Sequence, residues 1–192
     1  MGKAISSKLH KMRAEDLKRQ VKVYQKKADY KLPASIVKQF DVDELLEEGR
    51  LCYRLVPKQG FNGTYIMYLY SSRLCFRMNV TEWLFIARVA MACHAGIFVP
   101  MYPLAPDHCC REVFQMLEPA YRNCTKGQDV ERVVLMGTGS GAGLALSLAQ
   151  SAWREGLRKP DQLYLLSPVM DTEFFDKELE QELIENSRHT KW

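Results

Sequence analysis

The sequence predicts an α/β fold, with a mostly parallel sheet covered by helices on both faces. Short apolar runs typical of buried strands alternate with amphipathic stretches of about ten to fifteen residues that are typical of helices. The apolar runs are nearly continuous, as is usual for strands that are covered on both faces. The 192 residues, 47% of them hydrophobic, are enough to bury a substantial core.

The N-terminal part of the chain is strongly basic. Residues 1–38 contain nine lysines and two arginines but only three acidic residues, an excess of eight positive charges, so the remainder has a net charge of −4. A basic arm on an acidic body can contact a membrane surface, although a solvated helix face is the simpler interpretation. The first residues also fit the N-myristoylation pattern at Gly2. We expect weak membrane contact here and no nucleic-acid partner.

The first elements are predicted to be helical. Apolar spacing favours an amphipathic basic helix over residues 9–28, and a short acidic helix is expected over residues 41–48. We therefore divide the chain into a basic, cap-like helical segment, residues 1–50, and an α/β domain, residues 51–192.

Strands and helices alternate in the second segment. Apolar runs predict strands at residues 51–58, 64–70, 96–102, 132–137 and 162–168. Helices are predicted over residues 79–94, 113–121, 141–155 and 173–187. The first of these helices begins with a capping box formed by Asn79 and Glu82, and Pro119 is expected to bend the second.

An apolar run from Trp83 to Ala105 resembles a membrane span in length. Arg88 and His94 interrupt it, and Pro100 would break a helix there, so we interpret it as a buried helix followed by a buried strand.

Six cysteines occur without the spacing of a zinc site, and the chain starts with polar and basic residues rather than an apolar signal sequence. Reduced thiols in the cytoplasm are the simplest explanation. We therefore expect a cytoplasmic protein without a bound metal.

A glycine-rich turn in VVLMGTGSGAGLALSLAQ, residues 133–150, is the candidate functional site, because ligands bind beyond the carboxyl ends of parallel strands. Gly137, Gly139 and Ala142 satisfy the loosest form of the dinucleotide-binding fingerprint. That fingerprint also requires an acidic residue at the end of the next strand, where this chain has Ser167 and Pro168. A strand-to-helix turn of this kind can instead carry a nucleophilic serine.

Three segments of the sequence occur in the order and spacing of a known enzyme family. They are MYPLAPDH, then LMGTGSGAGLALSLA, then GLRKPDQLYLLSPVMD. Over residues 51–172 the chain resembles the hormone-sensitive-lipase-like branch of the α/β-hydrolases, which reads YRLAPEH, then GDSAGG, then LLSP. The resemblance implies a partial α/β-hydrolase fold that lacks the last two strands, in a protein related to esterases and lipases.

The resemblance also implies that the catalytic machinery is missing. Gly139 takes the place of the nucleophilic serine, and Ser140 lies one residue too far along the chain. Where the family has an HGGG oxyanion motif, the chain reads Tyr70, Ser71, Ser72 and Arg73. None of the four histidines, His10, His94, His108 and His189, occupies the position of the general base in the family.

We therefore expect an inactive hydrolase-fold protein that acts as a binding or interaction module, with no catalytic residue and no cofactor. A small apolar ligand would lie at the vestigial elbow and oxyanion region, formed by Tyr70, Ser71, Ser72, Arg73, Gly137, Gly139 and Ser140. Two alternatives stay open, a weak carboxylic-ester hydrolase and a nucleotide-binding module that uses the turn from Gly137 to Gly143.

The strand predicted at residues 162–168 has no later strand in the sequence to pair with. A bare strand edge tends to recruit another chain. We therefore expect a homodimer that forms through this edge of the sheet, unless the acidic segment that follows covers it.

Overall fold

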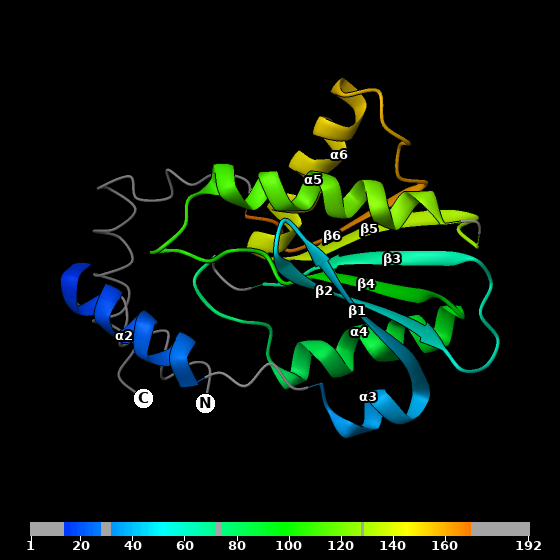
Figure 1. Cartoon of the computed structure of the whole chain (residues 1–192), viewed down its shortest axis with the longest axis horizontal. Coiled ribbons are helices and arrows are strands. Elements are labelled where there is room, and N and C mark those ends of the chain that lie inside the picture. The colour runs from blue at the N-terminus through cyan, green and yellow to red at the C-terminus, as the bar shows by residue number, and fades with distance from the viewer. Residues whose placement is uncertain (1–13, 28–31, 72–73, 128, 170–192) are drawn as a thin grey trace, which may run out of the picture.

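A mixed six-stranded sheet with helices on both faces forms the body of the molecule (Figure 1). The computed structural model describes residues 14–27, 32–71, 74–127 and 129–169. The strands are β1 (Phe40–Glu47), β2 (Arg50–Pro57), β3 (Thr64–Leu69), β4 (Gly96–Pro100), β5 (Arg132–Thr138) and β6 (Gln162–Leu166). Their order across the sheet is β1-β2-β4-β3-β5-β6.

The sheet is parallel on one side and antiparallel on the other. β3 pairs in parallel with β4 and β5, and β5 pairs in parallel with β6. β2 pairs antiparallel with both β1 and β4, so the first hairpin extends the parallel part of the sheet. The carboxyl ends of β4, β3, β5 and β6 therefore lie at one edge, which we call the carboxyl edge.

Helices cover both faces of the sheet. They are α2 (Ala14–Lys27), α3 (Ala34–Gln39), α4 (Val80–Cys93), α5 (Cys110–Lys126) and α6 (Ser140–Arg154). Figure 1 shows α4 on one face of the sheet and α5 with α6 on the other. Because both faces are covered, all five residues of β4 and the central residues of β5 are buried, as their continuous apolar sequence predicts.

The helix predicted at residues 79–94 is confirmed as α4. The Asn79 side chain accepts the N–H of Glu82, and the Glu82 carboxylate accepts the N–H of Asn79, so the capping box is present. The apolar run after Trp83 forms α4 and then the buried strand β4, as predicted. Within the described ranges, none of the helices combines the length and apolar character that crossing a bilayer requires.

The prediction of a short acidic helix at residues 41–48 is wrong. Residues 41–47 belong to β1, and Glu48 lies in the turn that follows it. The strand pairs with β2 along its whole length, from Phe40 opposite Pro57 to Glu47 opposite Arg50. Glu48 and Gly49 both have positive φ, 48° and 71°, which suits a tight two-residue hairpin turn. Cross-strand pairing thus outweighs the helix propensity of the glutamates and leucines.

This result places β1 and the first residue of β2 in the sheet, although both precede residue 51. The proposed division of the chain at residue 50 stays a prediction. α2 confirms the helix predicted at residues 9–28 where the structure describes it, and α3, which follows Pro33, was not predicted. α5 continues through Pro119.

β6 confirms the strand predicted at residues 162–168, and within the described residues it lies at the edge of the sheet, as predicted. Among the described strands, β6 pairs with β5 alone. Exposed and half-buried residues alternate along it, and Tyr164 is 50% exposed. With a neighbour on one side only, part of each outward-facing side chain remains in contact with solvent. The helix predicted at residues 173–187 lies outside the described residues.

Candidate functional site

The turn between β5 and α6, residues 138–140, has the geometry of a sharp strand-to-helix elbow, and we call it the Gly139 turn. Gly139 has φ 53° and ψ −119° and precedes the first residue of α6. Its N–H donates to the carbonyl of Leu166 (2.9 Å), and its carbonyl accepts the N–H of Val169 (3.0 Å). A backbone with positive φ strains most residues but not glycine. The structure thus has a sharp strand-to-helix turn where the sequence predicts one.

Ser71 occupies the space beside Gly139 where a side chain at that position would lie. An ideal Cβ on Gly139 would be 2.4 Å from Ser71 Oγ and 3.2 Å from Ser71 Cβ. The N–H of Ser71, the second residue after β3, donates to Glu82 Oε1 (2.7 Å), and this bond holds Ser71 in place. The side chain of Ser71 therefore stands where a side chain at position 139 would lie and would have to turn aside to admit one.

The glycines around the turn have a packing role. Gly137 lies at the end of β5, between Leu69 of β3 and Leu165 of β6. A Cβ on Gly141 would lie 2.1 Å from the carbonyl oxygen of Leu69, so the first turn of α6 can approach β3 only without a side chain there. Close packing of helix and strand thus explains these glycines without a bound phosphate.

Ser140 does not supply a hydroxyl to the site. It is the first residue of α6, and its Oγ is buried and has no hydrogen-bond partner among the described residues. A buried hydroxyl cannot attack a substrate that enters from solvent.

The predicted oxyanion region begins with a buried aromatic pair. Tyr70 is 1% exposed, and its ring stacks on Tyr102 at a centroid distance of 4.5 Å. The hydroxyl of Tyr102 donates to the carbonyl of Tyr70 (2.7 Å). Tyr70 therefore forms part of the core beneath the site. Ser72 and Arg73 lie outside the described residues, and ligand binding by this set stays a prediction.

Glu82 and Tyr68 lie near the turn, although the sequence patterns assigned neither of them to the site. Burial raises the pKa of Glu82, while the N–H groups of Ser71 and Asn79 lower it. The hydroxyl of Tyr68 shares a hydrogen bond with Thr138 Oγ1 (3.1 Å), and burial raises the pKa of Tyr68 to about 12. The capping pattern revealed Glu82, but only the approach of β3 to α4 brings its carboxylate to Ser71.

His108 is held by two neighbours, as expected for a structural residue. Its Nδ1 lies 2.8 Å from Glu112 Oε1, and its Nε2 lies 3.2 Å from Arg50 Nη2. Because arginine can only donate, Nε2 accepts and Nδ1 carries the proton. The N–H of Cys109 and then His108 lower the pKa of Glu112 to about 2. Both ring nitrogens are therefore occupied.

The other histidine that the structure describes is also away from the turn. His94 caps the C-terminus of α4 with φ 54°, and its carbonyl accepts the N–H of Asn62. His10 and His189 lie outside the described residues. Over the described parts of the chain, neither of the two histidines lies at the Gly139 turn, and no metal-binding group of three or more ligands is present.

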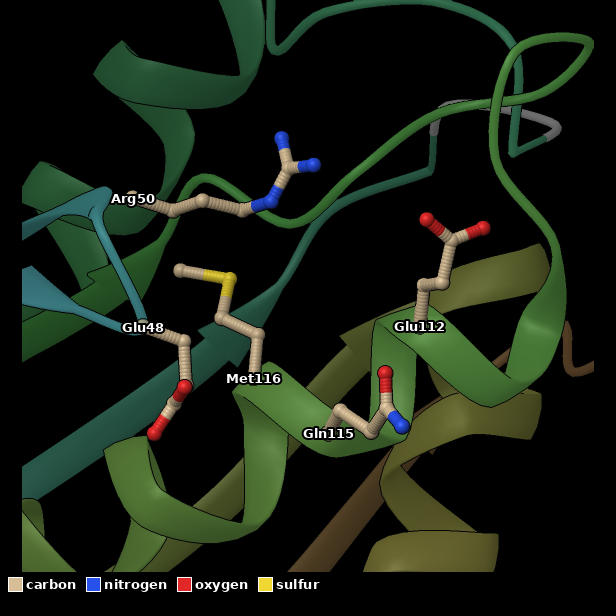
Figure 2. Close-up of a pocket in the computed structure, with 5 residues that line it drawn as sticks. All are labelled: Glu48, Arg50, Glu112, Gln115 and Met116. Atoms are coloured by element: carbon tan, nitrogen blue, oxygen red, sulfur yellow. The ribbon is translucent and has the colours of Figure 1, made fainter.

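A cavity of about 510 Å³ lies between the β1–β2 hairpin and the first half of α5 (Figure 2). It is lined by Glu48, Arg50, Glu112, Gln115 and Met116. None of these residues belongs to β5 or α6, so this cavity is separate from the Gly139 turn.

The fold and the elbow can be compared with known proteins. A family model described as alpha/beta hydrolase fold matches residues 66–191. No curated protein matches the chain at a significant level.

Several solved structures share the fold. A candidate esterase from Staphylococcus aureus is 22% identical, with a TM-score of 0.76 over 92% of this chain and 60% of that one. An esterase/lipase from an uncultured bacterium is 19% identical, with a TM-score of 0.65 over 86% of this chain and 62% of that one.

A hormone-sensitive lipase from a metagenome library is 22% identical, with a TM-score of 0.62 over 82% of this chain and 58% of that one. The chain thus spans about 60% of the length of these structures. At these identities the likeness establishes the fold, whereas the family match covers well over half of the chain. The chain therefore belongs to the α/β-hydrolase fold family.

Proposed function

We propose that this protein is an α/β-hydrolase-fold binding or interaction module that does not turn over esters. The observation that carries the proposal is the Gly139 turn, which has elbow geometry but presents glycine where a nucleophile would stand. Ser71 fills the space that a nucleophilic side chain needs. A small apolar ligand at the surface around this turn is the partner that we propose.

His108 and Ser140 also give little support to catalysis at the turn. Acyl transfer needs a nucleophile, a base within hydrogen-bond reach and donors for the oxyanion. Both nitrogens of His108 are taken up by Glu112 and Arg50, and the Oγ of Ser140 is buried. Triad members act as a unit, so the loss of two of them leaves little catalysis.

A weak carboxylic-ester hydrolase remains the second candidate function. The family match favours it, and so do the similar structures, two of which are named as an esterase/lipase and a hormone-sensitive lipase. The nucleotide-binding alternative is less favoured, because close packing also accounts for Gly137 of the fingerprint, where a Cβ would collide with the backbone of Gly141 and Ala142. A cytoplasmic location is also proposed, since the described structure joins none of the six cysteines in a disulfide.

Treatment of the folded full chain with a fluorophosphonate serine probe tests the proposal. We expect no labelling and no hydrolysis of short p-nitrophenyl esters above a heat-denatured sample. Ser71→Ala and Ser140→Ala variants serve as matched controls. Labelling that disappears in either variant would identify a reactive serine and would establish the esterase alternative instead.

A further inference from the structure

The outward face of α2 is a positively charged surface that the Gly139 turn does not use. The helix lies against the loops that follow β3 and β4, because Gln25 Nε2 donates to the carbonyls of Cys75 and Ala105, both at 2.8 Å. Val21 is 4% exposed, and the ring of Tyr24 meets that of Phe76 edge-on at 6.2 Å. These contacts fix which side of α2 faces away from the body.

Exposed cations gather on that outward side. Arg19, Val23 and Lys26 follow helical spacing along one stripe, with Lys18 and Lys22 beside it. Four of these five side chains are cationic and exposed, and Val23 between them is 45% exposed. Lys22 is paired with Asp107 (2.7 Å), whereas Lys18, Arg19 and Lys26 form no ion pair with any carboxylate whose side chain the structure describes.

A groove runs along the same helix. It has a volume of about 310 Å³ and is lined by Lys22, Gln25, Lys26, Arg77 and Asp107. Its walls are mostly cationic, and it has room for a small anionic group. The charged face therefore continues from α2 onto the neighbouring loop.

We propose that this outward face of α2 docks on an anionic phospholipid surface. Basic amphipathic helices bind such surfaces through cations that attract phosphate headgroups and through apolar side chains placed between them. The exposed Val23 among the cations favours lipid over nucleic acid, since single-stranded nucleic acid is bound mainly by stacked aromatic rings beside a basic groove. The ring of Tyr24 is instead engaged edge-on with Phe76.

The position of α2 also determines how a docked molecule would be oriented on the lipid surface. Cys75 and Ala105 lie in loops that leave the carboxyl edge of the sheet, so α2 lies at the same edge as the Gly139 turn (Figure 1). Docking through α2 would turn this edge toward the lipid. The proposal is independent of whether the protein hydrolyses esters.

Sedimentation of the full chain with vesicles tests the proposal. We expect binding to mixed phosphatidylcholine–phosphatidylglycerol vesicles but not to phosphatidylcholine alone, with loss of binding when NaCl is raised from roughly 0.05 to 0.5 M. Arg19→Glu/Lys26→Glu should lower the vesicle partition coefficient by about tenfold or more. Circular dichroism should show that this variant remains folded.

A matched variant separates the α2 face from net charge. Arg88→Glu/Lys126→Glu makes the same change in charge at exposed residues of α4 and α5 and should leave vesicle binding within about twofold. An equal fall in both variants would overturn the proposal in favour of general charge attraction, and unchanged binding in the α2 variant would place the contact elsewhere. Stronger binding of RNA than of vesicles, lost in the α2 variant, would make the surface a nucleic-acid site.

Discussion

At the scale of single residues, the contact between Ser71 and Gly139 explains how an elbow can persist without a nucleophile. Glycine adopts φ 53° at little cost, and the side chain of Ser71 occupies the space that a Cβ would need. Glu82 supports this arrangement from α4 by accepting the N–H of Ser71. The site is therefore packed, rather than left with a gap where the nucleophile is missing.

Gly139→Ser should destabilise the protein without creating an enzyme. We expect a loss of about 1 kcal/mol from backbone strain and about another 1 kcal/mol from the collision with Ser71. Urea denaturation measures the loss, and p-nitrophenyl esters measure activity. The double variant Gly139→Ser/Ser71→Gly should recover the steric part only. Ester turnover in either variant would reveal a base that the described residues do not show.

Glu112 should make stability depend on pH in acid. Its pKa in the folded protein, about 2, lies below the ordinary value of 4.5, so the folded state holds fewer protons than the unfolded state in this range. The stabilisation is present above pH 4.5 and is lost as pH falls toward 2. Wild type should therefore be more stable than Glu112→Gln near neutral pH, and thermal melts of the two should converge below pH 4.5. Glu155→Gln, at the exposed end of α6, is the control and should show no such convergence.

At the scale of elements, the two edges of the sheet are built differently. β1 forms one edge of the sheet, and most of its exposed residues are acidic. β6 forms the other edge of the described sheet and carries Tyr164, 50% exposed, and Leu166, 37% exposed. Exposed apolar side chains on an edge strand favour pairing with another chain.

We propose that β6 pairs with a second copy of the chain, and this pairing can be tested by light scattering. Tyr164→Lys places a charge on the edge, a device that natural sheets use against strand pairing, and should shift the protein toward monomer. Leu46→Lys, which removes the 72%-exposed leucine of β1, is the matched control and should leave the mass unchanged. A wild-type chain that is monomeric at high concentration would disprove the dimer.

At the scale of the whole molecule, one hydrophobic core joins the sheet to helices α3 to α6. The cysteines differ in whether they lie in this core. Cys52 and Cys124 lie in this core, whereas Cys93, Cys109 and Cys110 are exposed. Burial raises the pKa of Cys52 and of Cys124 to about 12, so neither forms the reactive thiolate at neutral pH.

Alkylation should therefore report on global folding. Iodoacetamide should modify Cys93, Cys109 and Cys110 in the native protein but reach Cys52 and Cys124 only after denaturation. Peptide mass spectrometry of native and denaturant-treated samples checks this pattern. Rapid modification of Cys124 in the native state would show that α5 opens locally, because this residue packs on the inner side of that helix.

Local patterns in the sequence determined most of the fold. Apolar runs located β2 to β6, the Asn79–Glu82 pair located the start of α4, and the three family-like segments identified the hydrolase fold. These predictions succeed because the patterns are local. A strand buried on both faces appears as a continuous apolar run, and a helix buried on one face appears as apolar residues at helical spacing.

Long-range contacts decided the rest. Residues 41–48 have a helix-like composition, and only pairing with β2 makes them a strand. The exposure of β6 depends on which strands lie beside it, and the filling of the elbow depends on the approach of Ser71 to Gly139, 68 residues apart in the sequence numbering. The sequence by itself therefore identified the family and predicted that glycine stands where the family has its nucleophile. Tertiary structure alone revealed that Ser71 lies beside Gly139, because the two residues follow different strands, β3 and β5, and no local pattern links them.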